Sequence, residues 1–318
     1  MPFAHLVGIF PRSEKVVELS RAVDRRRATT EELSEAIVED ERRVIALQRE
    51  AGLDYIVDGQ LRWQDLLRPF SVGIPGMEPG GIVRWFDNNT FYRRPVIRGP
   101  LHPTGKAVLA LLNLSALRGL RWKVVLPSPF TLATLSENAS GRRSDQVLED
   151  VAAVLRAEAQ GLAAAGCAYI QFNDPTLVTR EALGDLGLAR EALAKVTDGL
   201  RARTALHTFF GNVGPILGEL VQFPVDEIGL DLYAGSLNGI RGLAAGKTIL
   251  VGALDGRNSL LEDADALVEQ AVRVRDQLGA ADVALVPNCD LEFLPWEVAA
   301  AKTRRLGEAV SMLRAARR

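Results

Sequence analysis

Eight short apolar runs, separated by stretches with helical periodicity, are the feature that most constrains the fold of this chain. Apolar runs of this length are typical of parallel strands that are buried on both faces. Strands that alternate with helices predict βαβ units, and eight successive units favour a closed (β/α)8 TIM barrel over an open doubly wound sheet. The expected strands cover Leu6–Phe10, Tyr55–Asp58, Lys123–Leu126, Tyr169–Asn173, Thr204–Thr208, Ile228–Leu232, Thr248–Leu254 and Val283–Pro287.

The segments between these runs predict helices with defined ends. Glu14–Ala51 contains two helical segments, and Thr29 or Thr30 is expected to cap the second at its N-terminus. Ser144–Ala165 predicts another helix, and Gly166 lies where a glycine commonly ends one. Further helices are expected over Arg180–Arg201, Leu260–Leu278 and Trp296–Arg314.

A long insertion, at about residues 61–120, separates the second and third expected strands. It is rich in glycine and proline near its start, and Tyr92–Arg98 predicts one strand of an accessory hairpin. Insertions at the ends of barrel strands often carry specificity. We therefore expect one barrel domain over residues 1–318, with the insertion covering the barrel mouth.

Composition limits the possible partners. A chain of 318 residues suits a single α/β barrel, and 47% hydrophobic with 25% charged residues allows a large core. A net charge of −2 gives no support for a nucleic-acid partner. Two cysteines, no apparent signal peptide and no apolar run of membrane-spanning length predict a cytoplasmic protein with no membrane partner. A small-molecule substrate is expected from the polar residues at the strand ends.

Three residues of the types that bind zinc follow three different expected strands. His207, Asp231 and Cys289 could converge, because the carboxyl ends of barrel strands meet at one face. Zinc sites that activate thiols use these ligand types and leave one position open for the substrate. However, Phe209 stands where a fourth ligand is expected, and a free cysteine is often a small buried hydrophobic residue. A metal site and a chance alignment both remain open.

The turn after the seventh expected strand also carries polar groups. Asp255, Arg257 and Asn258 belong to the sequence GALDGRN. An arginine in such a turn can bind an anion or a substrate carboxylate in a bidentate manner. The alternative is an ordinary turn in which Asn258 or Ser259 caps the next helix.

Amides and carboxylates follow the second and fourth expected strands. Asp58 and Gln60 come after the second strand, and Asn173 and Asp174 after the fourth. Each pair could bind a substrate at the barrel mouth or cap a neighbouring segment of backbone.

The insertion contains the sequence RWFDNN, in which Trp85 and Phe86 are followed by Asp87, Asn88 and Asn89. Aromatic rings next to hydrogen-bonding groups suit a flat heterocycle. Packing within a loop is the alternative. No nucleophile elbow, phosphate-binding loop or dinucleotide fingerprint is present.

At these motifs the chain resembles the cobalamin-independent methionine synthase family. The resemblance runs through VGIFPRS, AGLDYIVDGQ, RWFDNNTFY, SPFT, YIQFNDPTL, TFFG, LDLYAG, GALDGRN and PNCDL. That family has two related (β/α)8 barrels, and its C-terminal barrel carries zinc and transfers a methyl group from a methyl-folate to homocysteine. RWFDNN, LDL-x-x-G and DGRN are more similar to the N-terminal barrel, which lacks the catalytic zinc and helps to hold the folate. The resemblance therefore implies a stand-alone barrel of the N-terminal type.

The resemblance also bears on metal binding. The zinc set of the catalytic half is a His-x-Cys pair, a Glu and a distant Cys. His207 and Cys289 match this set, Asp231 replaces the Glu, and Phe209 replaces the first Cys. Since phenylalanine binds no metal, the resemblance implies no zinc; a weakened site would have to use the three remaining residues.

The substrate positions of the catalytic half have changed as well. Ile9, Gln60 and Asn173 stand where that half has Ser, Glu and Asp, so two carboxylates that pair with a substrate ammonium have become neutral amides. Arg257 stands where it has a general-acid His. The substrate-binding candidates are accordingly Gln60, Asn173, Asp174, Asp255, Arg257 and Asn258.

Folate contacts of the N-terminal half are partly retained. Its Arg-Glu-Leu-Lys pattern corresponds here to residues 17–20, VELS, so both basic contacts are lost. Arg84 stands where that half has a Lys, and the resemblance assigns Arg84, Trp85, Asp87 and Asn89 to folate binding.

Three functions are compatible with this pattern. The first is an accessory or substrate-binding barrel that works with a separate zinc-bearing barrel in methyl transfer from a methyl-folate, or a related carrier, to a thiol such as homocysteine. The second is a divergent S-methyltransferase of the methyltetrahydropteroyltriglutamate–homocysteine type with a changed acceptor. The third is a barrel repurposed to bind an unrelated anion. Phe209 favours the first or third over the second.

Overall fold

The computed structural model describes residues 1–178 and 185–316. Seven parallel strands form one curved sheet in the order β1-β10-β9-β8-β7-β6-β4. Tyr55 and Ile56 occupy the eighth position, because Tyr55 bridges to His5 after β1 and Ile56 bridges to Trp122 before β4. These two bridges close the ring and confirm the expected (β/α)8 barrel. The strands are β1 Phe3–Ala4, β4 Lys123–Pro127, β6 Tyr169–Asn173, β7 Arg203–Thr208, β8 Glu227–Asp231, β9 Thr248–Leu254 and β10 Asp282–Pro287.

The third to eighth expected strands agree with the structure to within one residue, but the first was wrong. The prediction placed it at Leu6–Phe10, whereas β1 ends at Ala4. The backbone after His5 bonds to side chains in place of a neighbouring strand. Lys123 donates to the carbonyl of Leu6, and the amide N–H of Ile9 donates to Asp290.

The second expected strand, Tyr55–Asp58, lies at its predicted barrel position but is reduced to two isolated bridges, at Tyr55 and Ile56. Glutamine side chains replace the missing ladder. Gln48 pairs with both backbone groups of Val57, and Gln60 pairs with both backbone groups of Val125. A side-chain amide offers one donor and one acceptor at nearly the spacing of a peptide group, so it satisfies the backbone without a strand.

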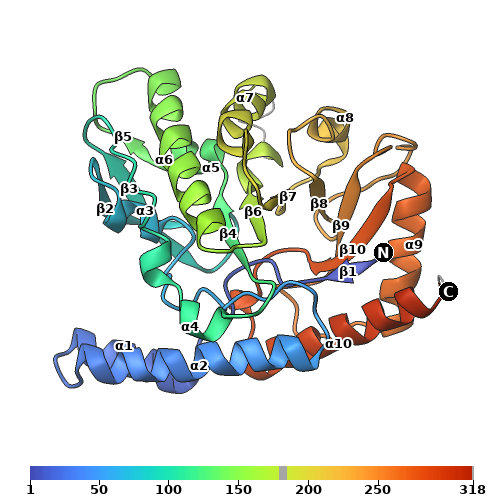
Figure 1. Ribbon diagram of the computed structural model, residues 1–318, viewed down its shortest axis with the longest axis horizontal. Helices are drawn as coiled ribbons and strands as arrows, with labels where there is room; N and C mark the ends of the chain where they lie inside the picture. The colour runs from blue at the N-terminus through green and yellow to red at the C-terminus, as the bar shows by residue number, and fades with distance from the viewer. Residues whose placement is uncertain (179–184, 317–318) are drawn as a thin grey trace.

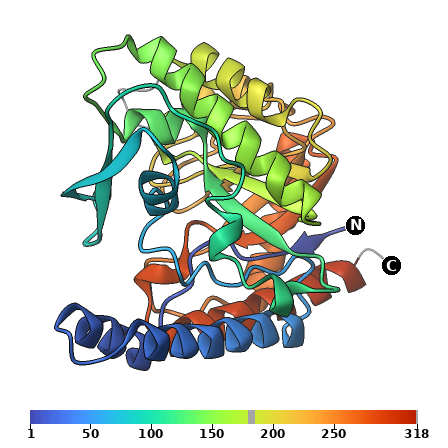
Figure 2. The same ribbon diagram turned by 60° about the vertical axis from the view of Figure 1, so that its left-hand side comes forward.

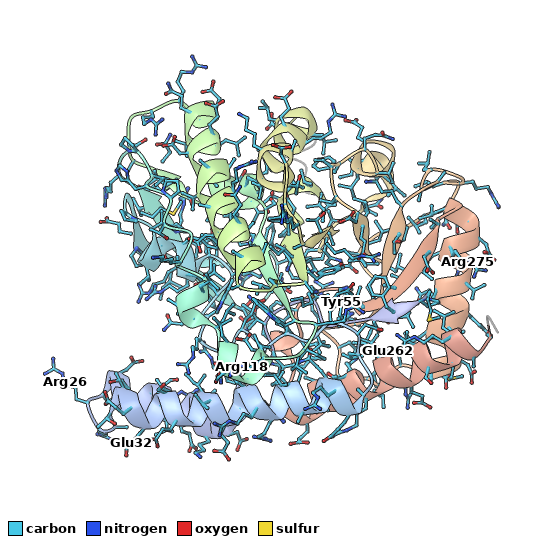
Figure 3. All side chains as sticks on the ribbon, in the orientation of Figure 1. Arg26, Glu32, Tyr55, Arg118, Glu262 and Arg275 are labelled. Carbon is cyan, nitrogen blue, oxygen red and sulfur yellow. The ribbon has the colours of Figure 1, made fainter. Side chains whose placement is uncertain are left out.

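Helices cover the outside of the barrel (Figures 1 and 2). The α1–α2 pair extends beyond the barrel on one side, with Arg26 at its far end (Figure 3). Thr29 is the N-cap of α2 and forms a capping box with Glu32, and Gly166, at φ +95°, follows α6. The expected helix over 180–201 lies partly outside the described residues. The helices are α1 Glu14–Asp24, α2 Thr30–Glu50, α3 Arg68–Gly73, α4 Leu114–Leu117, α5 Pro129–Thr134, α6 Ser144–Ala164, α7 Leu186–Thr197, α8 Leu217–Leu220, α9 Ala264–Leu278 and α10 Trp296–Ala315, with single 3-10 turns at Leu109–Leu111, Pro175–Val178, Gly214–Ile216 and Leu291–Phe293.

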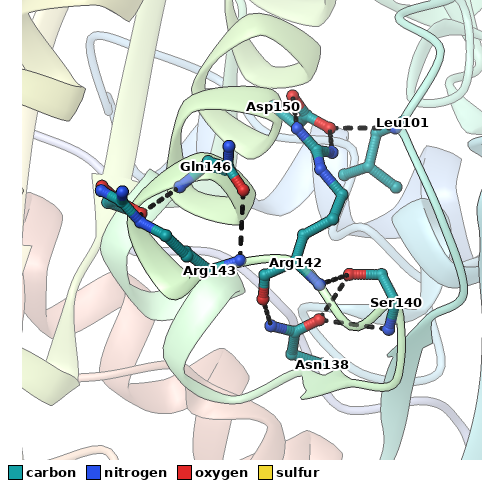
Figure 4. A network of polar contacts seen from close by, with 8 residues as sticks. Leu101, Asn138, Ser140, Arg142, Arg143, Gln146 and Asp150 are labelled. Carbon is teal, nitrogen blue, oxygen red and sulfur yellow. Dashed lines mark hydrogen bonds and ion pairs between the residues drawn. The ribbon is translucent and has the colours of Figure 1, made fainter.

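The insertion forms the expected hairpin. Strand β2 (Met77–Arg84) pairs antiparallel with β3 (Phe91–Ile97), and β5 (Glu137–Asn138) adds to β3 in parallel. Two carboxylates of α6 hold the chain that leaves the hairpin. Asp150 accepts from the N–H of Leu101 and pairs with Arg142 (Figure 4). Glu158 accepts from the backbone of Ala107 and Val108. The hairpin is thus tied to the barrel scaffold.

Polar groups occupy the centre of the barrel. The Nζ of Lys123 bonds to His5, to the carbonyl of Leu6 and to Gln171. Burial lowers the pKa of Lys123 well below its usual value. Gln171 in turn donates to the Oδ1 of Asn173, which points the network toward the carboxyl ends of the strands. Within the described ranges, no helix is long and apolar enough to cross a membrane.

Candidate functional site at the barrel mouth

The three candidate metal ligands meet around one residue, Asn288. Its carbonyl lies 2.7 Å from the Nε2 of His207, and its side-chain amide donates to Asp231 over 3.1 Å. Cys289 follows directly and is fully buried. Strands β7, β8 and β10 place these side chains at their carboxyl ends, where barrel enzymes build their sites.

The internal bonds of these groups do not fit a zinc ion. Asp231 already accepts from the backbone N–H groups of Phe210, Tyr233 and Ala234. The Nδ1 of His207 has no hydrogen-bond partner in the described part of the chain, but it lies over Gly229, where an added Cβ would come within 1.9 Å. Among the described residues, no three His, Cys, Asp or Glu side chains are arranged to hold a metal ion.

Burial sets the protonation of the His and Cys groups. It lowers the pKa of His207 to about 4, which keeps the imidazole neutral at neutral pH. Burial, followed by repulsion from Asp290 and Asp231, raises the pKa of Cys289 well above its usual value. Burial therefore favours the neutral thiol in this environment. Phe209 is also fully buried, with its ring centroid 5.8 Å from that of His207.

The turn after β9 packs against this cluster. Gly256 donates to the side chain of Asn288, and a Cβ at Gly256 would lie 2.9 Å from the sulfur of Cys289. Asp255 accepts from the N–H of Arg257 within the turn. The Arg257 guanidinium is exposed and lies 5.0 Å from the ring centroid of Phe210. The other candidate of this turn, Asn258, is exposed and accepts from the N–H of Leu260.

The three substrate candidates nearer the second and fourth barrel positions are buried and bonded within the protein. Gln60 pairs with the backbone of Val125 and has a φ of +48°. Asp174 accepts from the hydroxyls of Ser128 and Thr131. Asn173 accepts from Gln171, but its Nδ2 has no partner among the described residues. Of these three residues, only Asn173 has a side-chain nitrogen without any partner in the described part of the chain.

The hairpin tip reaches the barrel mouth through aromatic contacts. The ring centroid of Phe86 lies 5.7 Å from that of Phe210, and both residues have positive φ. For a non-glycine residue this backbone is strained, and such strain is common at functional sites. Trp85 is buried, whereas the remaining folate candidates of the tip, Arg84, Asp87 and Asn89, are exposed.

Two neighbouring cavities open at the mouth. The larger has a volume of about 1040 Å³ and lies between the loop after β1 and the start of α10; its lining includes Phe10, Arg12, Trp63, Gln64, Glu292 and Trp296. The smaller, of about 300 Å³, lies under the hairpin; its lining includes Gln64, Asp65, Trp85, Tyr92, Asp290 and Glu292. Both are lined by Gln64 and Glu292. Of the sequence candidates only Trp85 lines either cavity. The sequence analysis missed the other cavity residues; the carboxylates of Asp290 and Glu292, within PNCDLE, were the signal that could have pointed to this site.

Two acidic side chains of this segment have raised pKa values. Burial raises the pKa of Asp290 to about 6, although its Oδ1 accepts from the N–H of Ile9. Desolvation raises the pKa of Glu292 to about 8, and repulsion from Asp290 and Asp65 adds to this. Groups with such shifts in a cleft are candidates for function.

The Glu292→Gln variant should change how stability depends on pH. Since the folded protein raises the Glu292 pKa from 4.5 to about 8, it holds this proton more tightly than the unfolded chain. The group therefore destabilises the fold increasingly as pH rises from about 4.5 to about 8. We expect Glu292→Gln to raise the Tm over wild type at pH 8.5, with little effect at pH 4.5. Thermal unfolding of both proteins across this pH range tests the prediction, and a Tm difference that does not change with pH would contradict it. Glu269→Gln, at an exposed site on α9, is the control.

Comparisons with known proteins agree with this architecture. Residues 71–279 match the family model described as cobalamin-independent synthase, N-terminal domain. The methionine synthase of Sulfolobus acidocaldarius is 25% identical over 301 residues, which are 93% of this chain and 88% of that protein. The methionine synthase of Methanothermobacter marburgensis is 29% identical over 276 residues, 83% of this chain and 85% of that protein.

Longer relatives and solved structures are also similar. The 5-methyltetrahydropteroyltriglutamate–homocysteine methyltransferase of Mycobacterium tuberculosis is 32% identical over 236 residues, which are 71% of this chain but only 30% of that enzyme. A B12-independent methionine synthase from Shewanella, solved with selenomethionine, shares the fold with a TM-score of 0.79 and 20% identity, over 99% of both chains. The family model covers well over half of this chain, so the chain belongs to the cobalamin-independent methionine synthase family.

Proposed function

We propose that this barrel binds substrates for methyl transfer from a methyl-folate, or a related carrier, to a thiol such as homocysteine, and that a separate zinc-bearing barrel performs the transfer. The observation that carries the proposal is the bonding at the strand ends. His207 and Asp231 are committed to Asn288 and to backbone groups, while a cavity of about 1040 Å³ lies between the loop after β1 and the start of α10. The barrel thus offers room for a ligand without an available metal set.

The linings of the cavity support a substrate role. Phe10, Trp63 and Trp296 contribute aromatic surface, and Arg12 and Glu292 contribute charge. Much of the remaining wall is charged, with Lys15, Arg21 and Arg43 beside acidic side chains, so the cavity suits a ligand that carries both a ring and charged groups. The activity named for the relatives reaches this chain through the family match, and the buried Phe209 at the position of a fourth ligand supports a role in binding more than in chemistry.

Metal content separates this function from that of a self-sufficient methyltransferase. We expect protein purified without chelators to contain far less than one zinc per chain, and Cys289→Ser to leave that content unchanged. Elemental analysis measures both. Stoichiometric zinc that is lost in Cys289→Ser would overturn the accessory role and favour a divergent methyltransferase.

Ligand binding tests the other half of the proposal. Methyl-tetrahydrofolate or homocysteine should raise the Tm, since a ligand that binds only the folded state stabilises it. A zinc-bearing catalytic barrel of the family, added in equal amounts, should form a complex or gain activity. If neither ligand shifts the Tm and the added barrel neither binds nor responds, the proposal is wrong.

A further inference from the structure

The smaller cavity, under the hairpin, contains an unusual concentration of acid. Asp65, Asp290 and Glu292 all line its volume of about 300 Å³. Asp290 is 2% exposed and Asp65 is 8% exposed. Both are anchored by backbone N–H groups, Asp290 by Ile9 and Asp65 by Leu67, Arg68 and Arg93. Arg12 lines the larger cavity but not this one.

The same cavity contains hydrogen-bond donors without partners. Within the described ranges, the indole N–H of Trp85 and the hydroxyl of Thr90 are buried and make no hydrogen bond, and both residues line the cavity. Trp85 is only 5% exposed. A buried donor that lacks a partner costs free energy, so an unbonded donor at a cavity wall indicates a missing acceptor. The ring of Trp85 packs edge-on against Tyr92 at 5.4 Å, which fixes its orientation.

We propose that this cavity binds a small organic cation that also carries a neutral oxygen acceptor, such as an amino alcohol. Its ammonium group would lie between Asp290 and Glu292, near the Trp85 and Tyr92 rings, and its oxygen would accept from Trp85 and Thr90. Carboxylates and aromatic faces both attract a desolvated ammonium group. A ligand that also carried a negative charge would be repelled by the three acids. The inference goes beyond the proposed function, because it requires neither a folate nor a thiol.

Protonation supports this charge preference. Without a cation, Glu292 is largely protonated at pH 7, because its pKa is about 8. The charged groups facing it are Asp290 from its own segment, Asp65 from the segment before the hairpin, and Arg12 from the loop after β1. A bound cation would outweigh this repulsion and favour the carboxylate. Cation binding at pH 7 should therefore release a proton.

Calorimetry with three matched probes tests the proposal on the full-length protein. Ethanolamine and choline carry the cation with a hydroxyl, and 3,3-dimethylbutan-1-ol is the neutral isostere of choline. We expect at least one cation to bind while the isostere does not, and titrations in two buffers of different ionisation enthalpy to show proton release. Tighter binding of ethanolamine would assign an unmethylated ammonium, and tighter binding of choline a methylated one.

Variants locate the site. Glu292→Gln should lower the affinity for the cation by roughly tenfold to a hundredfold, as expected for loss of a charged hydrogen bond. Trp85→Phe keeps a ring but removes the N–H, so it should weaken binding less. Glu269→Gln makes the same charge change on exposed α9 and should leave binding unchanged. The inference is wrong if neither cation binds, if the neutral isostere binds equally well, or if Glu292→Gln binds like wild type. Since Glu292 also lines the larger cavity, Trp85→Phe, which changes only the smaller one, separates cation binding from folate or homocysteine binding.

Discussion

The Gly307→Ala variant should lose much of its folding stability through the addition of one methyl group. Gly307 lies in α10, where that helix packs against the end of α2. A Cβ at this position would lie 1.9 Å from the carbonyl oxygen of Ala51 and 2.8 Å from its carbonyl carbon. Backbone atoms cannot rotate away as a long side chain can, so the two helices must separate. Overpacking of this kind costs about 1–3 kcal/mol or more.

A second glycine provides the matched control. Gly187 is also helical, in α7, but nothing lies within 4 Å of the Cβ that alanine would add there. Gly187→Ala should therefore stabilise the protein by about 0.5–1 kcal/mol, since alanine favours the helix. Urea unfolding of both variants measures the free energy of unfolding. If Gly307→Ala matched wild type, the close approach of α10 to α2 would be wrong.

The sequence predicts six of the eight barrel positions because those strands are continuous apolar runs in a regular ladder. At the first position the predicted bounds are wrong, and at the second the strand is only two bridges long, for one physical reason. At Val57 and Val125 the backbone bonds to Gln48 and Gln60, and at Leu6 it bonds to Lys123. Strand propensity gives no information about a side chain whose hydrogen bonds replace those of a neighbouring strand. Only the tertiary fold brings the side chains of Gln48, Gln60 and Lys123 to these backbone groups.

The candidate site was predictable in outline. Positions at strand ends suffice to suggest that His207, Asp231 and Cys289 lie near one another. Their chemical state was not predictable, because it depends on Asn288, whose carbonyl, amide nitrogen and amide oxygen each bind a different segment. An asparagine next to a cysteine has no distinctive sequence signal.

The acidic cavity was beyond sequence reasoning for a different reason. Asp65 and Glu292 are more than 200 residues apart in the chain, and only the folded hairpin encloses them with Trp85. The family resemblance implied only that neutral amides, Gln60 and Asn173, stand where the catalytic half has carboxylates. It gave no sign that carboxylates gather instead at another wall of the mouth.

Asp231→Ala should be the most destabilising substitution among the candidate metal ligands. The carboxylate accepts from three backbone N–H groups, those of Phe210, Tyr233 and Ala234, and from the side chain of Asn288. Alanine would leave four buried or half-buried donors unsatisfied, at a cost of about 3–5 kcal/mol. Asp231→Asn keeps one oxygen but turns an NH₂ group toward one of the donors, so its loss should be smaller.

Denaturant unfolding, run in parallel with metal analysis, distinguishes structure from chemistry at Asp231. If the residue anchors the loops after β7 and β8, stability should fall in the order wild type, Asp231→Asn, Asp231→Ala, while zinc content stays constant. A residue that mainly held a metal would behave differently, because both variants would lose zinc together. Asp24→Ala, an exposed aspartate at the end of α1, should stay within about 0.5 kcal/mol of wild type. An Asp231→Ala protein as stable as Asp24→Ala would contradict the anchoring role, because four donors cannot lose their acceptor in a buried site without measurable cost.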